Sequence, residues 1–212
     1  MESLTHFADS WFPAAAAVFV VGFGWRMVRL LRLPRPKDIA PPKGDAAKGA
    51  VYALTFAMLP WKKESTRIHW VTYTAGMAMH LGLFLAILYA LVRLAGWSGP
   101  GLDMVMQGAA PMGWAAAFGL FVKRIFKRSM RAISTPDDFV SSLLVQGVLL
   151  GAWLTALDGG WWPLWKVAAM ALMVYIPLGK LFHMVLFFFS RVFFGRQFGS
   201  RGVLRHAAPV SY

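Results

Sequence analysis

The chain has 212 residues, of which 58% are hydrophobic and only 15% charged, and its mean hydropathy of +0.55 is well above that of a soluble domain. Lys and Arg residues number 22 against nine acids, but they flank apolar runs instead of forming the patch typical of nucleic-acid binding, which excludes a nucleic-acid partner. The chain has no cysteine, which excludes disulfides, thiolate metal sites and covalently attached c-type haem.

Five apolar stretches are each long enough to cross a bilayer as a helix, which takes about 20 residues for a hydrocarbon core of about 30 Å. The N-terminal sequence MESLTHFADS lacks the basic region of a signal peptide, so we expect the first stretch to remain in the mature protein. The sequence therefore predicts an all-α membrane protein with a single membrane domain, residues 1–212, built as a five-transmembrane-helix bundle. The predicted spans are 11–31, 70–93, 101–123, 138–157 and 163–191.

Residues 32–69, between the first two predicted spans, are expected to form a cytoplasmic loop. The loop begins with PRPKDIAPPKGD, which is rich in proline and charge, and then becomes mildly apolar over a segment too short for a span. We therefore expect a helix near 46–58 that lies on the membrane surface or contacts a partner.

The basic clusters of the chain all fall on one side of the predicted bundle. They follow the first span (RMVRLLRLPRPK), precede the second (WKKESTR), end the third (VKRIFKRSMR) and end the fifth (SRVFFGRQFGSR). Loops rich in Lys and Arg stay in the cytoplasm, which predicts an N-terminus outside, a C-terminus in the cytoplasm and a multi-pass protein of the cell inner (cytoplasmic) membrane.

The fourth predicted span is preceded by a helix-start signal, Ser134-Thr135-Pro136-Asp137-Asp138. A hydroxyl residue is a favoured N-cap, proline is favoured in the first turn, and acids are stabilised at the positive end of the helix dipole. The sequence therefore predicts that this helix begins at this point.

Ionisable residues inside a membrane span are costly and are functional candidates, and His69, His80 and His183 meet this criterion. His80 is 13 residues from Arg67, and His183 is eight residues from Arg191 and 13 from Arg196. At about 1.5 Å per residue the two histidines can lie at the same depth on antiparallel helices. Two imidazoles at one depth can be the axial ligands of a b-type haem, so His80 and His183 are the predicted ligands of a haem iron.

Other roles for these side chains stay open. His69 is an alternative ligand or a contact to a haem propionate, and Lys180 and Arg131 are candidates for propionate or quinone contacts. His80 and His183 are also compatible with helix-to-helix hydrogen bonds or with a proton relay in a small transporter. A relay usually includes carboxylates within the membrane, and the second to fifth predicted spans have none in their interiors.

The stretches KRIFKRSMRAISTPDDFVSSLLVQGVLLG (123–151) and PLGKLFH (177–183) resemble the cytochrome b (gamma) subunit of respiratory nitrate reductase. Arg131-Ala132-Ile133-Ser134 and Leu143-Leu144-Val145-Gln146 match the family's pattern at the fourth helix. Pro177, Lys180, Leu181 and His183 match its pattern at the fifth, and the likeness covers most of 65–197. Related subunits anchor sulfite-reductase-associated and heterodisulfide-reductase-like complexes.

The resemblance implies haem b as cofactor, and the chain departs from the family in a way that bears on the number of haems. Met79-His80-Leu81-Gly82 matches the family's first ligand in the second helix, but Ala90 stands where a second histidine is expected. Trp165 likewise stands where the fifth helix of the family carries another histidine. The resemblance therefore implies one haem held by His80 and His183, with two haems as the alternative.

The function expected from this resemblance is that of a haem b membrane subunit in a respiratory electron-transfer complex. It would pass electrons between the quinone pool and an iron–sulfur, flavin or molybdenum subunit on the cytoplasmic side, as the quinone-reactive part of an oxidoreductase and not as a complete enzyme. The alternative is a haem-free membrane anchor or a small transporter. A partner subunit or anionic lipid would dock on the basic inner surface, which is formed by Lys62, Lys63, Arg124, Lys127, Arg128 and the C-terminal arginines.

Overall fold

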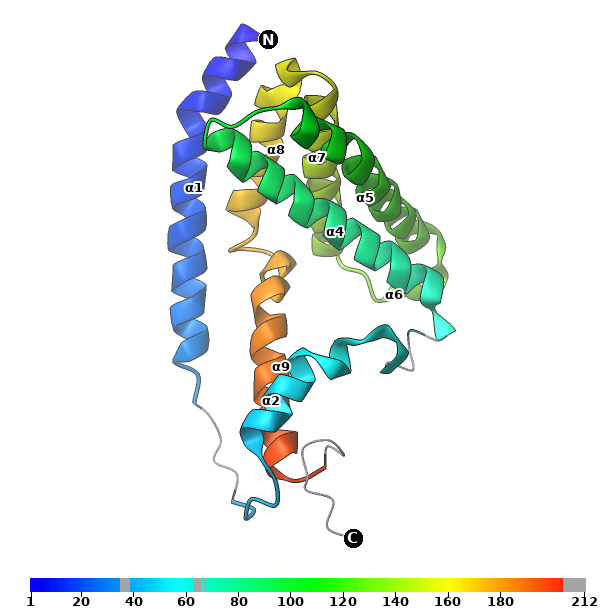
Figure 1. The fold of residues 1–212 in the computed structure, drawn as a ribbon. Coiled ribbons are helices and arrows are strands. Elements are labelled where there is room, and N and C mark those ends of the chain that lie inside the picture. The colour runs from blue at the N-terminus through cyan, green and yellow to red at the C-terminus, as the bar shows by residue number, and fades with distance from the viewer. Residues whose placement is uncertain (35–38, 63–65, 67, 204–212) are drawn as a thin grey trace. The chain divides into compact units, whose positions relative to one another are not determined.

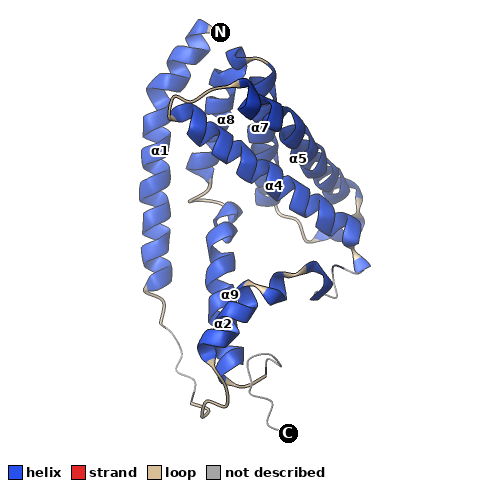
Figure 2. Ribbon diagram, viewed as in Figure 1, coloured by secondary structure: helices blue, strands red, loops and turns tan. Residues whose placement is uncertain are grey.

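The computed structural model describes residues 1–34, 39–62, 66 and 68–203, and every regular element among them is helical (Figures 1 and 2). The chain divides into two compact units: unit 1 contains Met1–Val28 and Val71–Leu181, and unit 2 contains Arg29–Trp70 and Phe182–Tyr212. The α-helices are α1 (Glu2–Leu31), α2 (Ala46–Leu54), α4 (Trp70–Leu94), α5 (Pro100–Phe126), α6 (Arg128–Ala132), α7 (Pro136–Leu157), α8 (Trp162–Tyr175) and α9 (His183–Ser200). Short 3₁₀ turns are η1 (Phe56–Met58), η2 (Pro60–Lys62), η3 (Gly159–Trp161) and η4 (Lys180–Phe182).

Four of the described helices, α1, α4, α5 and α7, are long and apolar enough to cross a membrane. A fifth span results only if α8 and α9, which are separated by a short break, are counted together. The structure thus supports a multi-pass membrane protein with four or five spanning helices. α4, α5 and α7 agree with the predicted spans to within three residues at each end, whereas α1 begins nine residues earlier than predicted.

In unit 1, α4 and α5 run antiparallel and approach closely where both carry glycine. A Cβ added at Gly82 would lie 2.8 Å from the Cα of Gly113, a distance that no real side chain tolerates. Near one end of the pair the Lys123 ammonium contacts the Thr72 hydroxyl, and near the other the Tyr89 hydroxyl donates to Asp103 at 2.6 Å. Small residues at the crossing let the two backbones meet, as in other membrane helix pairs.

The core of unit 1 lies where α7 packs between α5 and α8 (Figure 1). Leu149 of α7 is fully buried and would contact a Cβ at Gly113 at 3.3 Å. On the other side of α7, Gly151 leaves room for Trp165, whose Cα would lie 3.1 Å from an added Cβ. α7 is the most completely buried of the candidate spans, which is why its apolar residues are not confined to one stripe.

The predicted helix start before α7 is confirmed. Thr135 is the N-cap, Pro136 occupies the first turn, and the Asp138 carboxylate accepts hydrogen bonds from the Thr135 backbone N–H at 2.8 Å and hydroxyl at 3.0 Å. These bonds fix the chain just before the helix and leave Asp138 near the positive end of its dipole.

The sequence predicted one helix over 163–191, and this prediction is wrong. The helix ends at Tyr175, and regular helical structure resumes only with η4 and α9. Pro177 has no backbone N–H to continue the helix, and its ring clashes with the preceding turn. Gly179 lies against the Tyr175 ring, whose Cε1 would be 2.6 Å from an added Cβ, so any larger residue there would displace that ring.

Unit 2 is built on the packing of α2 against α9 (Figure 2). Gly195 and Gly199, one helical turn apart on α9, lie on the face that meets Gly49 and Ala53 of α2. A Cβ at Gly199 would lie 2.7 Å from the Gly49 Cα. The α2 and η1 segment agrees with the helix expected near 46–58.

Candidate functional site

His80 lies on α4 of unit 1 with its side chain exposed. Its ring Nδ1 is 2.7 Å from the backbone carbonyl oxygen of Gly76, one turn earlier. A carbonyl oxygen can only accept, so Nδ1 is the donor in this hydrogen bond, and in the neutral imidazole Nε2 then keeps its lone pair. The His80 ring also packs against Phe84, with ring centroids 6.3 Å apart. The side chain is therefore oriented by its own helix and presents one nitrogen to a ligand.

His183 and His69 belong to unit 2 and are both exposed. His183 is the first residue of α9, directly after the break that follows α8, and His69 stands one residue before α4. His80 belongs to unit 1, so the pairing of His80 with His183 stays a prediction, as does the alternative role of His69.

Lys180, a candidate for propionate or quinone contacts, takes part in a polar cluster at the start of α7. Its ammonium is 2.8 Å from both the Asp138 carboxylate and the Thr135 hydroxyl, and its side chain is 47% exposed. Arg124 of α5 approaches the same carboxylate at 3.4 Å. Arg131, the other candidate, lies exposed on α6. Lys180 is thus shared with Asp138, and a ligand that recruits it would have to compete with that carboxylate.

A neighbouring contact joins the end of α8 to the start of α7. The Tyr175 hydroxyl lies 2.9 Å from the Asp137 backbone carbonyl and also contacts its carboxylate, and Asp137 accepts from the Lys180 backbone N–H at 3.0 Å. The two acids predicted to start the fourth span therefore also bind the chain at the α8 break. Sequence spacing alone gave no sign of this second role.

The opposite end of unit 1 holds ion pairs that sequence reasoning missed. The Lys166 ammonium of α8, whose side chain is only 8% exposed, forms a salt bridge with Asp9 of α1. The Arg93 guanidinium lies 3.3 Å from Asp103 and 5.3 Å from the Trp162 ring centroid. The sequence did contain a signal for the Asp9–Lys166 pair, because these residues stand at the predicted outer ends of the first and fifth spans.

Trp165 and Ala90, which stand where the resemblance leads one to expect histidines, are both buried in unit 1. Trp165 is 5% exposed and stacks on Trp162 with centroids 4.8 Å apart, while Ala90 is 2% exposed. The Trp165 indole Nε1 is buried without a hydrogen-bond partner in the described part of the chain. Neither position offers a metal ligand, and both are filled by helix packing.

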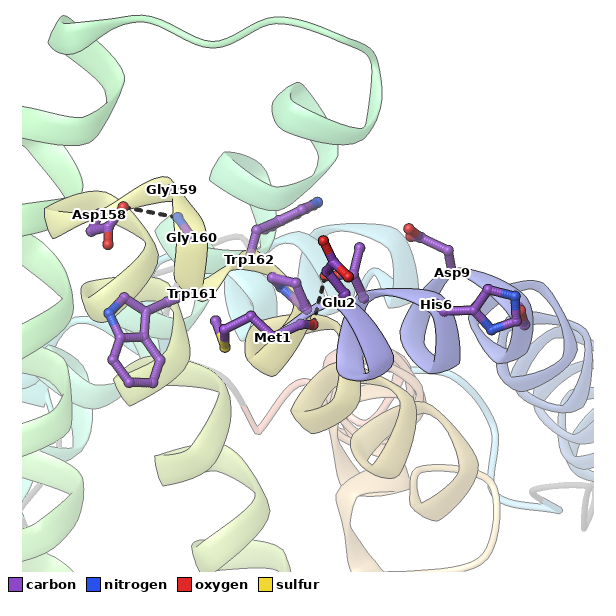
Figure 3. A pocket seen from close by; sticks show the side chains of 12 residues that line it. Met1, Glu2, His6, Asp9, Asp158, Gly159, Gly160, Trp161 and Trp162 are labelled. Atoms are coloured by element: carbon purple, nitrogen blue, oxygen red, sulfur yellow. Dashed lines mark hydrogen bonds between the residues drawn. The ribbon is translucent and has the colours of Figure 1, made fainter.

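A pocket of about 1200 Å³ opens between the N-terminal end of α1 and the turn from α7 to α8 (Figure 3). Asp158 accepts from the Gly160 N–H at 3.0 Å, and the His6 imidazole points away from the Trp161 indole. Within residues 1–34, 39–62, 66 and 68–203, no group of three or more His, Asp or Glu side chains is placed to hold a metal ion. The pocket therefore offers carboxylates and indoles that do not converge on one point.

Comparison with models of protein families, with curated proteins and with solved structures finds no match to this chain. The assignment of function accordingly depends on the residues of this chain and their geometry.

Proposed function

We propose that the chain is a haem b membrane subunit of a respiratory electron-transfer complex, with His80 and His183 as axial ligands. It would span the cell inner (cytoplasmic) membrane five times, with α8 and α9 as one interrupted span, the N-terminus outside and the C-terminus in the cytoplasm. Electrons would pass between the quinone pool and a cytoplasmic-side iron–sulfur, flavin or molybdenum subunit. The resemblance to the cytochrome b (gamma) subunit of respiratory nitrate reductase supports this assignment.

The observation that carries the proposal is the hydrogen bond between His80 Nδ1 and the Gly76 carbonyl. A histidine that binds a metal through one ring nitrogen donates its other N–H to a carbonyl or carboxylate, which fixes the tautomer and the ring orientation. His80 has this arrangement in the apolar middle of α4, where an imidazole is costly without a role.

The surroundings of His80 suit a large flat ring. Gly76, one turn before His80, has open space where a side chain would stand, with no atom within 4 Å of an added Cβ. Phe84 adds an aromatic wall on the same helix. A bound haem b would supply reversible one-electron transfer. The chain's contribution would be to hold the ring through two imidazoles and to surround it with apolar side chains.

The burial of Ala90 and Trp165 supports one haem instead of two. A second haem would need ligands at these positions, and its ring would have to displace the stacked Trp162 and Trp165 side chains. Losing both ligands together is consistent with the loss of a haem as a unit.

The basic inner surface would dock the partner subunit. Of its residues, Lys62, Arg124, Lys127 and Arg128 are described, whereas Lys63 lies outside the described residues. Lys127 and Arg128 are exposed between α5 and α6, where they could meet an acidic surface.

The test is a reduced-minus-oxidised absorption spectrum of the purified chain, together with a pyridine haemochrome assay. We expect one haem b per chain, lost in His80→Ala and in His183→Ala. The matched controls are His6→Ala, in the N-terminal turns of α1, and His69→Ala, which should retain the haem. A haem-free wild type, or a haem retained in both His80→Ala and His69→Ala, would overturn the proposal. Loss in His69→Ala with retention in His80→Ala would exchange their roles.

The alternative, a small transporter or a haem-free anchor, is favoured by one observation. Asp9 and Lys166 form an ion pair between two candidate membrane segments, and Lys166 is buried. Paired ionisable residues on membrane helices mark ion and proton pathways in transporters, and this pair would stand at the outer end of such a pathway. If the purified chain holds no haem, proton flux into proteoliposomes by wild type and by Asp9→Asn would test this alternative.

A further inference from the structure

Unit 2 contains a groove of about 530 Å³ between α2 with η1 on one side and α9 on the other. Its walls are mainly aromatic, and one cation stands among them. The residues that define this groove are Tyr52, Ala57, Phe187, Arg191, Phe194 and Phe198.

The glycine contact between α2 and α9 explains why the groove exists. Gly195 and Gly199 bring the two backbones together along one line, so the larger side chains of α9 stand to the side of that line. Phe194 and Phe198 stack on each other with centroids 6.2 Å apart, yet remain 51% and 46% exposed. The groove is therefore an apolar surface that the described part of unit 2 leaves uncovered.

Arg191 gives the groove its charge. Its guanidinium lies 5.4 Å from the Phe187 ring centroid, and it forms no ion pair with a carboxylate of the described residues. Asp45 is the acidic residue among the described residues of unit 2. Its carboxylate accepts hydrogen bonds from the Ala47 and Lys48 backbone N–H groups at the start of α2. The described lysines and arginines of unit 2 are Arg29, Arg32, Lys43, Lys48, Lys62, Arg191, Arg196 and Arg201.

We propose that this groove binds an anionic phospholipid, with its phosphate on Arg191 and an acyl chain against Phe187, Phe194 and Phe198. A guanidinium that has no carboxylate partner among the described residues of a cationic unit favours an anionic occupant, and aromatic walls favour an apolar one. Inorganic phosphate would satisfy only the first requirement. α2, an amphipathic helix beside a candidate span, is of the kind that lies at the headgroup boundary. The inference is independent of haem.

A peptide or protein partner fits the groove less well. The Ser190 hydroxyl in the groove already donates to the Phe187 carbonyl at 2.8 Å, so its proton is not available to a carbonyl of a peptide backbone. A lipid chain needs no such partners. The charge of the groove and its apolar lining together favour a lipid.

The experiment uses the full chain, stripped of lipid in a neutral maltoside detergent, and native mass spectrometry to count bound dioctanoyl phosphatidylglycerol or dioctanoyl phosphatidylcholine. Wild type should bind the anionic lipid at least about fivefold more tightly, as expected for one arginine at an anionic headgroup. Arg191→Gln should remove this preference. The matched control is Arg196→Gln, which removes the same charge from an exposed position of α9 outside the groove and should keep it.

Phe194→Ala tests the acyl-chain contact separately from the charge. It should weaken the binding of both lipids to the same extent and leave the ratio of their affinities unchanged. If Arg191→Gln and Arg196→Gln lost the preference for the anionic lipid equally, the attraction would come from the overall charge and the proposed site would be wrong. Equal binding of the two lipids by wild type would also contradict the proposal. If a protein subunit shielded Arg191 and Phe194 from chemical modification in a complex purified from native membranes, the groove would hold this subunit and not a lipid. That result would overturn the proposal. Circular dichroism checks that each variant keeps its helix content.

Discussion

Replacing Gly49 by alanine should loosen α2 from α9, and the structure allows the size of the effect to be worked out. An alanine Cβ at this position would lie 2.6 Å from the Gly199 Cα and closer still to the Gly195 carbonyl oxygen. Both obstacles are backbone, so no side-chain rotation can relieve them. Ordinary contact begins at 3.4 Å, so the two helices must separate by at least about 0.8 Å to relieve the Gly199 contact, and by more at the Gly195 oxygen.

Overpacking of this kind costs about 1–3 kcal/mol. We expect the upper end here, because separation of the backbones also weakens the packing of Gly195 and Ala53. Alanine regains about 1 kcal/mol through its higher helix propensity. The net destabilisation of the α2–α9 contact is therefore about 2 kcal/mol, equivalent to a roughly 30-fold larger open fraction.

Hydrogen–deuterium exchange of the peptide that covers α2 is the suitable assay. α2 has nine residues, and isolated helices this short are marginal in water, so its protection depends on docking to α9. Exchange should be about 30-fold faster in Gly49→Ala. Gly108→Ala, in α5 with no atom within 4 Å of its added Cβ, should leave α2 unchanged. Unchanged or slower α2 exchange in Gly49→Ala would refute the reasoning.

Three further predictions concern polar groups. Asp9→Asn leaves the Lys166 ammonium buried without its carboxylate and should lower the free energy of unfolding by about 1–2 kcal/mol. Lys166→Met should cost less, because the Asp9 side chain that it leaves behind is 59% exposed. Thermal unfolding of both variants in one detergent compares the two losses. Tyr175→Phe removes the hydroxyl bonded to Asp137 and should cost about 1 kcal/mol in the same assay, and no loss would show that the bond contributes nothing. Two backbone N–H groups of α2 hold the pKa of Asp45 below its usual 3.8, so its stabilisation of α2 is present above that pH and lost as the pH falls through the lowered value. Exchange of α2, corrected for intrinsic rates, should therefore accelerate from pH 6 to pH 3, and Asp45→Asn should not show this acceleration.

The sequence predicted a helix correctly where a single physical requirement determines that helix. α4, α5 and α7 are apolar over the length that a bilayer demands, and Thr135 with Asp138 marks the start of α7 by cap chemistry that is local in sequence. α2 was expected because the segment near 46–58 becomes mildly apolar but is too short for a span. These features depend on neighbours a few residues apart, which a single sequence displays directly.

Features that depend on contacts between distant segments were not predictable in the same way. The sequence shows that Gly49, Gly195 and Gly199 are small, but not that they meet. It shows Asp9 and Lys166, but a salt bridge across 157 residues requires the packing of α1 on α8. His80 was found from the cost of an imidazole in a span, whereas its hydrogen bond to Gly76 needed coordinates.

The break between α8 and α9 shows why composition alone gave one continuous span. Pro177 and Gly179 were visible in the sequence, yet a helix interrupted in an apolar environment persists only if its freed backbone groups find partners. Those partners come from other helices of unit 1. Arg26 of α1 donates to the carbonyls of Pro177 at 3.0 Å and Gly179 at 3.3 Å, while Asp137 of α7 accepts from the Lys180 N–H. Because the break directly precedes His183, the same contacts that stabilise it also fix where the helix carrying the proposed haem ligand begins.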